Sequence, residues 1–114
     1  MKSNNTYKYV DYLWDEKKAA SLGNDQVALF LYRSNILGVD LRITNFGGGN
    51  TSCKTIEKDP IAKEKVEVMW IKGSGGDIGT LNRDGIAGLY NQKLHDLKKV
   101  YQGIEHEDEM VALF

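Results

Sequence analysis

Two glycine-rich segments, residues 45–52 and 72–79, constrain the fold of this chain more than any other feature of its sequence. They hold seven of its 12 glycines, three in the first segment and four in the second. Glycine adopts positive φ angles without steric cost and lets a ligand approach the bare backbone, and consecutive amide N–H groups can converge on an anion. We therefore expect both segments to be turns, and we expect the two turns to form one phosphate-binding cradle.

The stretch between the two turns predicts an antiparallel β-hairpin. Residues 51–57 are β-branched and small, whereas residues 65–71 alternate valine and tryptophan with more polar neighbours, which is the period of a strand. The polar segment 58–64 is the loop between them. The second glycine turn follows directly at the end of the stronger strand.

Two helices are expected before the hairpin. Asp15 is the N-cap of a short helix over residues 16–22, and Asn24 or Asp25 starts a second helix over residues 26–37. The apolar residues that follow the helical period in the second helix are Val27, Phe30, Leu31 and Leu37. These residues predict one buried face on the longer helix.

Three other segments carry weaker signals. Residues 41–43 alternate apolar and basic side chains, which predicts an extended entry into the first turn. Asp84 is a candidate N-cap for a helix that runs to Tyr101, although residues 85–88 equally fit a short strand. The acidic residues 105–109, followed by apolar residues, are typical of a helix beginning.

Composition limits the class of protein. The 114 residues suffice for one domain, with residues 1–8 as a polar, loosely ordered lead-in. A net charge of −1 argues against nucleic acid as a partner, and no apolar run approaches the roughly 20 residues of a membrane span. The single cysteine, Cys53, excludes an internal disulfide and favours a cytoplasmic location.

The second turn carries suitable groups for a phosphate monoester. Lys72, the Ser74 hydroxyl and free amide N–H groups can all donate to phosphate oxygens, and Asn50 in the first turn adds a side-chain amide. The sequence is not a dinucleotide-binding fingerprint, because Ile78 takes the place of the third glycine, and it is not a P-loop. One glycine run alone would equally fit a structural turn.

Catalytic machinery is not visible in the sequence. As a nucleophile, Cys53 would need a base such as His95 or His106, and no spacing places one beside it. The two histidines form no zinc-binding pair, and three zinc ligands cannot be assembled. We therefore predict a binding site and name no catalytic residue and no metal ligand.

Four blocks of this sequence, in the same order, resemble the class II aldolase/adducin family. They are RSNILG at 33–38, RITNFGGGNTS at 42–52, WIKGSGGD at 70–77 and HEDEM at 106–110. Within the family, the resemblance is strongest to the N-terminal aldolase part of bifunctional rhamnulose-1-phosphate aldolase/dehydrogenases. It covers nearly all of residues 13–114.

The resemblance implies a fold, a reaction and a site. The fold is a three-layer α/β/α domain around a mostly antiparallel sheet, which would be incomplete in this chain, and the assembly is a homo-oligomer, usually a tetramer. The reaction is the cleavage of a ketose 1-phosphate, here rhamnulose 1-phosphate, to dihydroxyacetone phosphate and lactaldehyde. The implied phosphate ligands are Asn50, Ser74 and Gly75, with Lys72 and Gly73 as further candidates.

The resemblance also implies that part of the machinery lies elsewhere. The catalytic carboxylate and the zinc-binding histidines of these enzymes would come after Phe114, so this chain is expected to be the N-terminal piece of a zinc-dependent lyase. Alone it is expected to bind no zinc and to be inactive. A non-catalytic, adducin-like association module is the alternative, and a nucleotide-binding domain is a third, which the missing third glycine disfavours.

Overall fold

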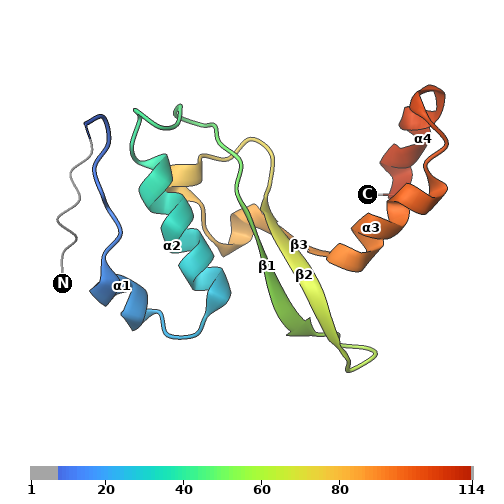
Figure 1. The fold of residues 1–114 in the computed structure, drawn as a ribbon, viewed down its shortest axis with the longest axis horizontal. Helices are drawn as coiled ribbons and strands as arrows, with labels where there is room; N and C mark the ends of the chain where they lie inside the picture. The colour runs from blue at the N-terminus through green and yellow to red at the C-terminus, as the bar shows by residue number, and fades with distance from the viewer. Residues whose placement is uncertain (1–7, 114) are drawn as a thin grey trace.

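The computed structural model describes residues 8–113, which form one sheet with helices on either side of it (Figure 1). The expected lead-in, residues 1–8, therefore lies outside the described residues except for Lys8. The described strands are β1 (Ser52–Lys58), β2 (Lys65–Lys72) and β3 (Ile86–Tyr90), and the sheet order is β1-β2-β3. The helices are α1 (Glu16–Ser21), α2 (Gln26–Gly38), α3 (Asn91–Val100) and α4 (Glu107–Met110), with short 3₁₀ turns η1 (Ile78–Thr80), η2 (Arg83–Gly85), η3 (Ile104–His106) and η4 (Val111–Leu113).

The predicted hairpin is confirmed. β1 and β2 pair antiparallel, with Ser52 opposite Ile71 at one end and Lys58 opposite Lys65 at the other. Asp59 shapes the connecting loop, because its carboxylate accepts hydrogen bonds from the amides of two residues that follow it, at 2.8 and 3.1 Å. These amide hydrogen bonds lower the pKa of Asp59. Backbone hydrogen bonds from the Asp59 amide to the Glu64 carbonyl, at 2.8 Å, and from the Lys63 amide to the Asp59 carbonyl, at 2.9 Å, also close the loop.

The two N-terminal helices are also confirmed. Asp15 caps α1, accepting from the Lys17 amide at 2.9 Å, and Asp25 caps α2, accepting from the Ala28 amide at 3.0 Å. The buried positions of α2 are Val27, Phe30, Ser34 and Gly38. Leu37, predicted to be buried, is 41% exposed. The prediction was wrong because the second half of α2 packs through small residues and not through leucine.

The predicted extended segment at 41–43 is wrong. These residues form a turn, in which the amides of Ile43 and Thr44 donate to the Asp40 carbonyl at 2.9 and 3.1 Å. The Arg42 guanidinium donates to the Asp40 carboxylate at 2.9 Å, and Asp40 is only 8% exposed. The alternation of apolar and basic residues therefore reflects a turn in which the half-exposed Arg42 pairs with the buried Asp40, with Leu41 exposed.

The helix predicted to start at Asp84 begins later. Asp84 lies in η2, and the following residues form β3, which pairs antiparallel with β2; for example, Ile86 lies opposite Lys72 and Leu89 opposite Met69. The short-strand alternative was thus the right one, and α3 starts at Asn91. The helix expected near residues 105–109 is confirmed as η3 and α4.

The buried apolar side chains come from α1, α2, β2 and the segment around η1. They are Ala19, Val27, Phe30, Val68, Ile78 and Leu81. α2 contacts both η1 and β1, whereas α3 and α4 extend away from the opposite side of the sheet (Figure 1). Among the described residues, no helix has the length and apolar character needed to cross a lipid bilayer. The fold thus places α2 against η1 and β1, the two elements that adjoin the glycine turns.

Candidate anion-binding site

The two glycine turns leave the hairpin at the same end. The first turn enters β1 and the second leaves β2, at the end opposite to the loop over residues 59–64 (Figure 1). The Lys72 amide donates to the Thr51 carbonyl at 3.1 Å, so the strand pairing continues to the edge of both turns. Asn50 precedes Thr51, and Gly73 follows Lys72. The candidate residues of the two turns therefore come from neighbouring chain segments.

Both turns reverse direction through a glycine with a positive φ angle. In the first turn, the Gly48 amide donates to the Asn45 carbonyl at 3.1 Å, and Gly47 between them has φ 75°. In the second turn, Gly75 has φ 85°. Only glycine adopts these angles without strain. The two turns thus use glycine in the same way.

Several donors of the two turns face solvent without a protein partner. Asn50 and Ser74 are exposed, and their side chains make no hydrogen bond to another described residue. The amide N–H groups of Gly49, Asn50, Ser74 and Gly75 likewise have no partner among residues 8–113. An unpaired backbone donor is a ready ligand for an anion. The arrangement has the chemistry of a phosphate site, and its occupancy stays a prediction.

The remaining two candidates in the second turn are differently placed. The half-buried Lys72 directs its ammonium group at the Gly73 carbonyl, at 3.1 Å. The Gly73 amide donates to the Gly85 carbonyl at 2.8 Å. Gly73 therefore offers no free N–H group to a ligand, whereas Lys72 supplies positive charge beside the turn.

Helix α2 holds the flanks of both turns through three consecutive side chains. The Arg33 guanidinium donates to the Ser52 carbonyl at 3.0 Å, and the buried Ser34 hydroxyl lies 2.9 Å from the Thr51 hydroxyl. The Asn35 amide donates to the Ile78 carbonyl at 3.0 Å. The sequence predicted no role for these residues, because their contacts join parts of the chain that are far apart in sequence. Their only sequence signal was that they belong to one of the four blocks of the resemblance.

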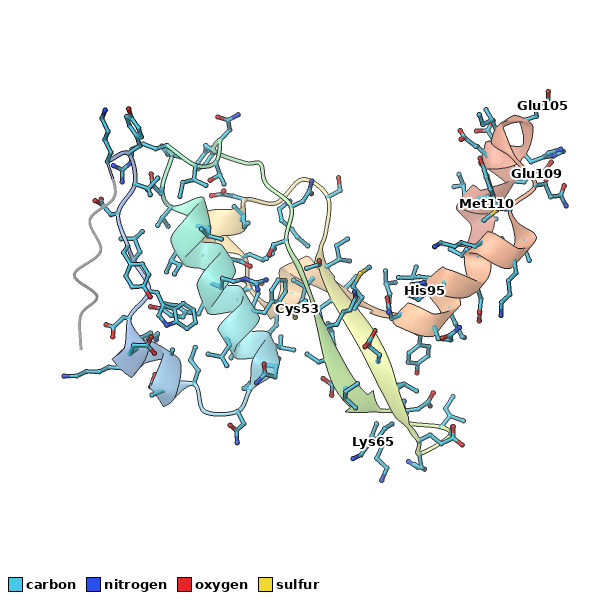
Figure 2. The ribbon with its side chains drawn as sticks, viewed as in Figure 1. Cys53, Lys65, His95, Glu105, Glu109 and Met110 are labelled. Carbon is cyan, nitrogen blue, oxygen red and sulfur yellow. The ribbon has the colours of Figure 1, made fainter. Side chains whose placement is uncertain are left out.

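Cys53 lies close to this site without a base. Burial raises the pKa of its thiol, opposed by the nearby Arg33. Figure 2 shows Cys53 on the hairpin and His95 on α3, well apart, with Glu105 in η3 and Glu109 in α4 further out. This geometry agrees with a structural role for Cys53.

The described residues do not fit a zinc ion. Within residues 8–113, no three histidine, cysteine, aspartate or glutamate side chains come together in a way that could hold a metal. The His106 ring contacts the Glu109 carboxylate at 3.0 Å as a pair within one turn of helix.

Two cavities lie away from the turns. One, of about 490 Å³, is lined by residues around Asp40 and Arg42, and the other, of about 340 Å³, lies on the sheet beside Val68 and Trp70. Neither is lined by a residue of the two glycine turns. The unpaired amide donors lie in the two turns and not in either cavity, so we place the candidate site at the turns.

Comparisons with known proteins agree with this fold. The sequence matches no protein-family model. The structure is similar to that of the N-terminal class II aldolase domain of a conserved protein from Thermoplasma acidophilum, with a TM-score of 0.67 and 27% sequence identity, over 91% of this chain and 45% of that chain. This chain has the fold of part of a class II aldolase domain. The predicted α/β class with an antiparallel sheet is thereby confirmed.

A curated relative gives a second similarity. The chain is 43% identical over 100 residues to the uncharacterized oxidoreductase YuxG of Bacillus subtilis. The match covers 88% of this chain and 14% of that relative. The chain therefore spans less than half of the aldolase-domain structure and about one seventh of the curated relative.

Proposed function

We propose that this chain supplies the substrate-phosphate-binding part of a class II aldolase, a lyase that cleaves a ketose 1-phosphate. The observation that carries this proposal is the placement of the two glycine turns at one end of the hairpin, with unpaired donors in both. The similarity to a class II aldolase domain supports the same class of reaction.

The proposed ligands act by binding and orienting the substrate. Phosphate oxygens would accept hydrogen bonds from the Asn50 amide, the Ser74 hydroxyl and the Gly75 amide N–H, and Lys72 would balance part of the negative charge. A phosphate group held in this way fixes the substrate for the bond that breaks. Gly73 would contribute by holding the turn through its hydrogen bond to Gly85.

The proposed substrate is rhamnulose 1-phosphate, with dihydroxyacetone phosphate and lactaldehyde as products. This finer assignment depends on the resemblance of the four sequence blocks. The same resemblance assigns the zinc ion and its histidines to other parts of such an enzyme. We therefore propose that this chain alone binds no zinc and is inactive, and that the enzyme acts in the cytoplasm as a homo-oligomer.

An association module of the adducin type remains the second proposal. The observation that favours it is the exposure of large apolar side chains, such as Phe46 at 84%, Ile61 at 90% and Ile104 at 81%. A protein that works only by association needs no ligand in the glycine turns. Phosphate binding therefore separates the two proposals.

Isothermal titration calorimetry of the 114-residue chain tests the aldolase proposal. We expect inorganic phosphate and dihydroxyacetone phosphate to bind at one site and to compete with each other. Zinc should give no stoichiometric binding to this chain. Absence of any phosphate binding would contradict the proposal, and binding of ATP or NAD without competition by phosphate would favour a nucleotide-binding domain.

A further inference from the structure

Ile78 joins the two glycine turns to each other. Its amide donates to the Gly48 carbonyl at 3.4 Å, and its side chain lies against Gly49, where an added Cβ would meet the Ile78 Cγ2 at 3.0 Å. The residue is only 3% exposed, although it follows directly on a surface turn. Ile78 therefore contacts the first turn while it belongs to the end of the second.

Helix α2 also holds Ile78, because a Cβ added at Gly38 would lie 2.5 Å from the Ile78 Cγ2. The Asn35 amide donates to the carbonyls of both Ile78 and Leu81, each at 3.0 Å. Next to this contact, Gly38 packs directly on the backbone of Gly79, because a Cβ on Gly38 would lie 2.2 Å from the Gly79 nitrogen. Backbone packed on backbone leaves η1 little room to move along α2. The position of Ile78 is therefore set by the helix.

We propose that Ile78 is a positioning residue of the anion site, holding the first turn at the distance from the second at which both can donate to one anion. This inference depends on the proposed function, since it states how that site is assembled. Ile78 stands where a dinucleotide-binding loop would have its third glycine. Here a branched side chain is needed, because it fills the space beneath Gly49.

The first turn needs such a positioning residue because its glycines give its backbone much conformational freedom. Gly47 and Gly49 both have positive φ angles, at 75° and 96°, and glycine loses more conformational freedom on ordering than any other residue. Without the Ile78 side chain, Gly49 has lost its packing partner. An anion that needs both turns must then order the first turn as it binds, which weakens its affinity.

The test compares Ile78→Ala with Leu81→Ala. Leu81 is 7% exposed, and its substitution by alanine removes the same number of carbon atoms as Ile78→Ala. The Leu81 side chain, however, packs near Gly85 and not near the first turn. In Ile78→Ala, we expect the ¹⁵N order parameters of Gly48 and Gly49 to fall from about 0.8 to below about 0.6. We expect the dissociation constant for inorganic phosphate to rise at least about tenfold.

Leu81→Ala should change the phosphate dissociation constant by less than about twofold and leave the order parameters of the first turn unchanged. Ile78→Val keeps the Cγ2 that faces Gly49 and should restore both quantities to those of the natural chain. An equal loss of order in both alanine variants, or no loss in Ile78→Ala, would overturn the inference.

A second pair of variants tests the same contact if Ile78→Ala does not fold. Gly49→Ala would press a Cβ against Ile78, whereas Gly47→Ala adds one where nothing lies within 4 Å, and both carry a positive φ angle. Greater loss of order and of phosphate affinity in Gly49→Ala supports the inference, and equal losses overturn it. If the natural chain binds no phosphate, the proposed function fails, and the order parameters alone then decide whether Ile78 positions the turns.

Discussion

Asn50 and Ser74 carry the side-chain part of the proposed phosphate site. Both are exposed and make no hydrogen bond to another described residue, so replacing either by alanine should leave the stability of the chain unchanged. Each variant should lose a hydrogen bond to a charged group, worth about 1.5–3 kcal/mol of binding free energy, and calorimetry should show phosphate affinity falling roughly 10- to 150-fold.

Exposed residues of the same types serve as controls. Ser21 is the last residue of α1, and Asn24 lies in the connection between α1 and α2; both are away from the turns. Asn24→Ala and Ser21→Ala should bind phosphate as the natural chain does. Unchanged phosphate affinity in both Asn50→Ala and Ser74→Ala would mean that the anion binds elsewhere.

Asp40 should make stability depend on pH. Hydrogen bonds from Arg42 hold the pKa of Asp40 below its ordinary value of 3.8. A carboxyl group with a lower pKa in the folded state adds stability above its ordinary pKa, and that stability is lost as the pH falls through the folded pKa. We therefore expect the free energy of unfolding, measured by urea denaturation, to decrease below about pH 3.8.

The Asp40→Asn variant isolates this contribution. It lacks the titrating carboxylate and its ion pair with Arg42, so it should be less stable near neutral pH and should lose less stability on acidification. Curves of stability against pH that run parallel in the variant and the natural chain would contradict the assigned role of Asp40.

The second turn should tolerate alanine at Gly76 and not at Gly75. Gly75 has φ 85°, whereas Gly76 has no positive φ angle, and an added Cβ would meet nothing within 4 Å at either position. Gly75→Ala should therefore cost about 1–2 kcal/mol of unfolding free energy through backbone strain alone.

Gly76→Ala is the matched control, with an expected change within about 0.5 kcal/mol. Phosphate affinity should fall in Gly75→Ala, because the turn must distort, and should persist in Gly76→Ala. Equal stabilities of the two variants would show that the second turn does not need the left-handed conformation at Gly75.

Elements with a strong local pattern could be predicted from the sequence. The hairpin follows from period-two alternation, and α1 and α2 follow from their aspartate caps. The start of α3 was misplaced because Ile86 and Leu89 fit a helical period as well as a strand, and only pairing with β2 decides between them. The extended segment at 41–43 was misplaced because the ion pair of Asp40 and Arg42 has no periodic signal.

The same distinction applies to the candidate site. The glycine turns are local features, and sequence reasoning found them and their exposed donors. The residues that hold them, Asn35, Gly38 and Ile78, act through contacts between α2 and η1, about 40 residues apart in the chain. No local pattern predicts such contacts, and Ile78 served only to exclude a nucleotide fingerprint.

For the whole molecule, the exposed apolar side chains predict self-association. Phe46, Ile61 and Ile104 are each more than 80% exposed, and they lie in the first turn, the hairpin loop and η3, respectively. Large exposed apolar residues favour contact with another protein surface. We expect size-exclusion chromatography with light scattering to give a mass above 12.8 kDa that rises with concentration.

A mass equal to that of one chain at every concentration would contradict the proposed homo-oligomer. It would leave the phosphate site untouched, because the exposed donors of both turns belong to a single chain.

An NMR titration with inorganic phosphate shows whether the two turns form one anion site. We expect the amide signals of residues 47–50 and 74–76 to shift together, with a single dissociation constant for both turns. Shifts confined to one turn, two different dissociation constants, or shifts located elsewhere on the chain would contradict the claim.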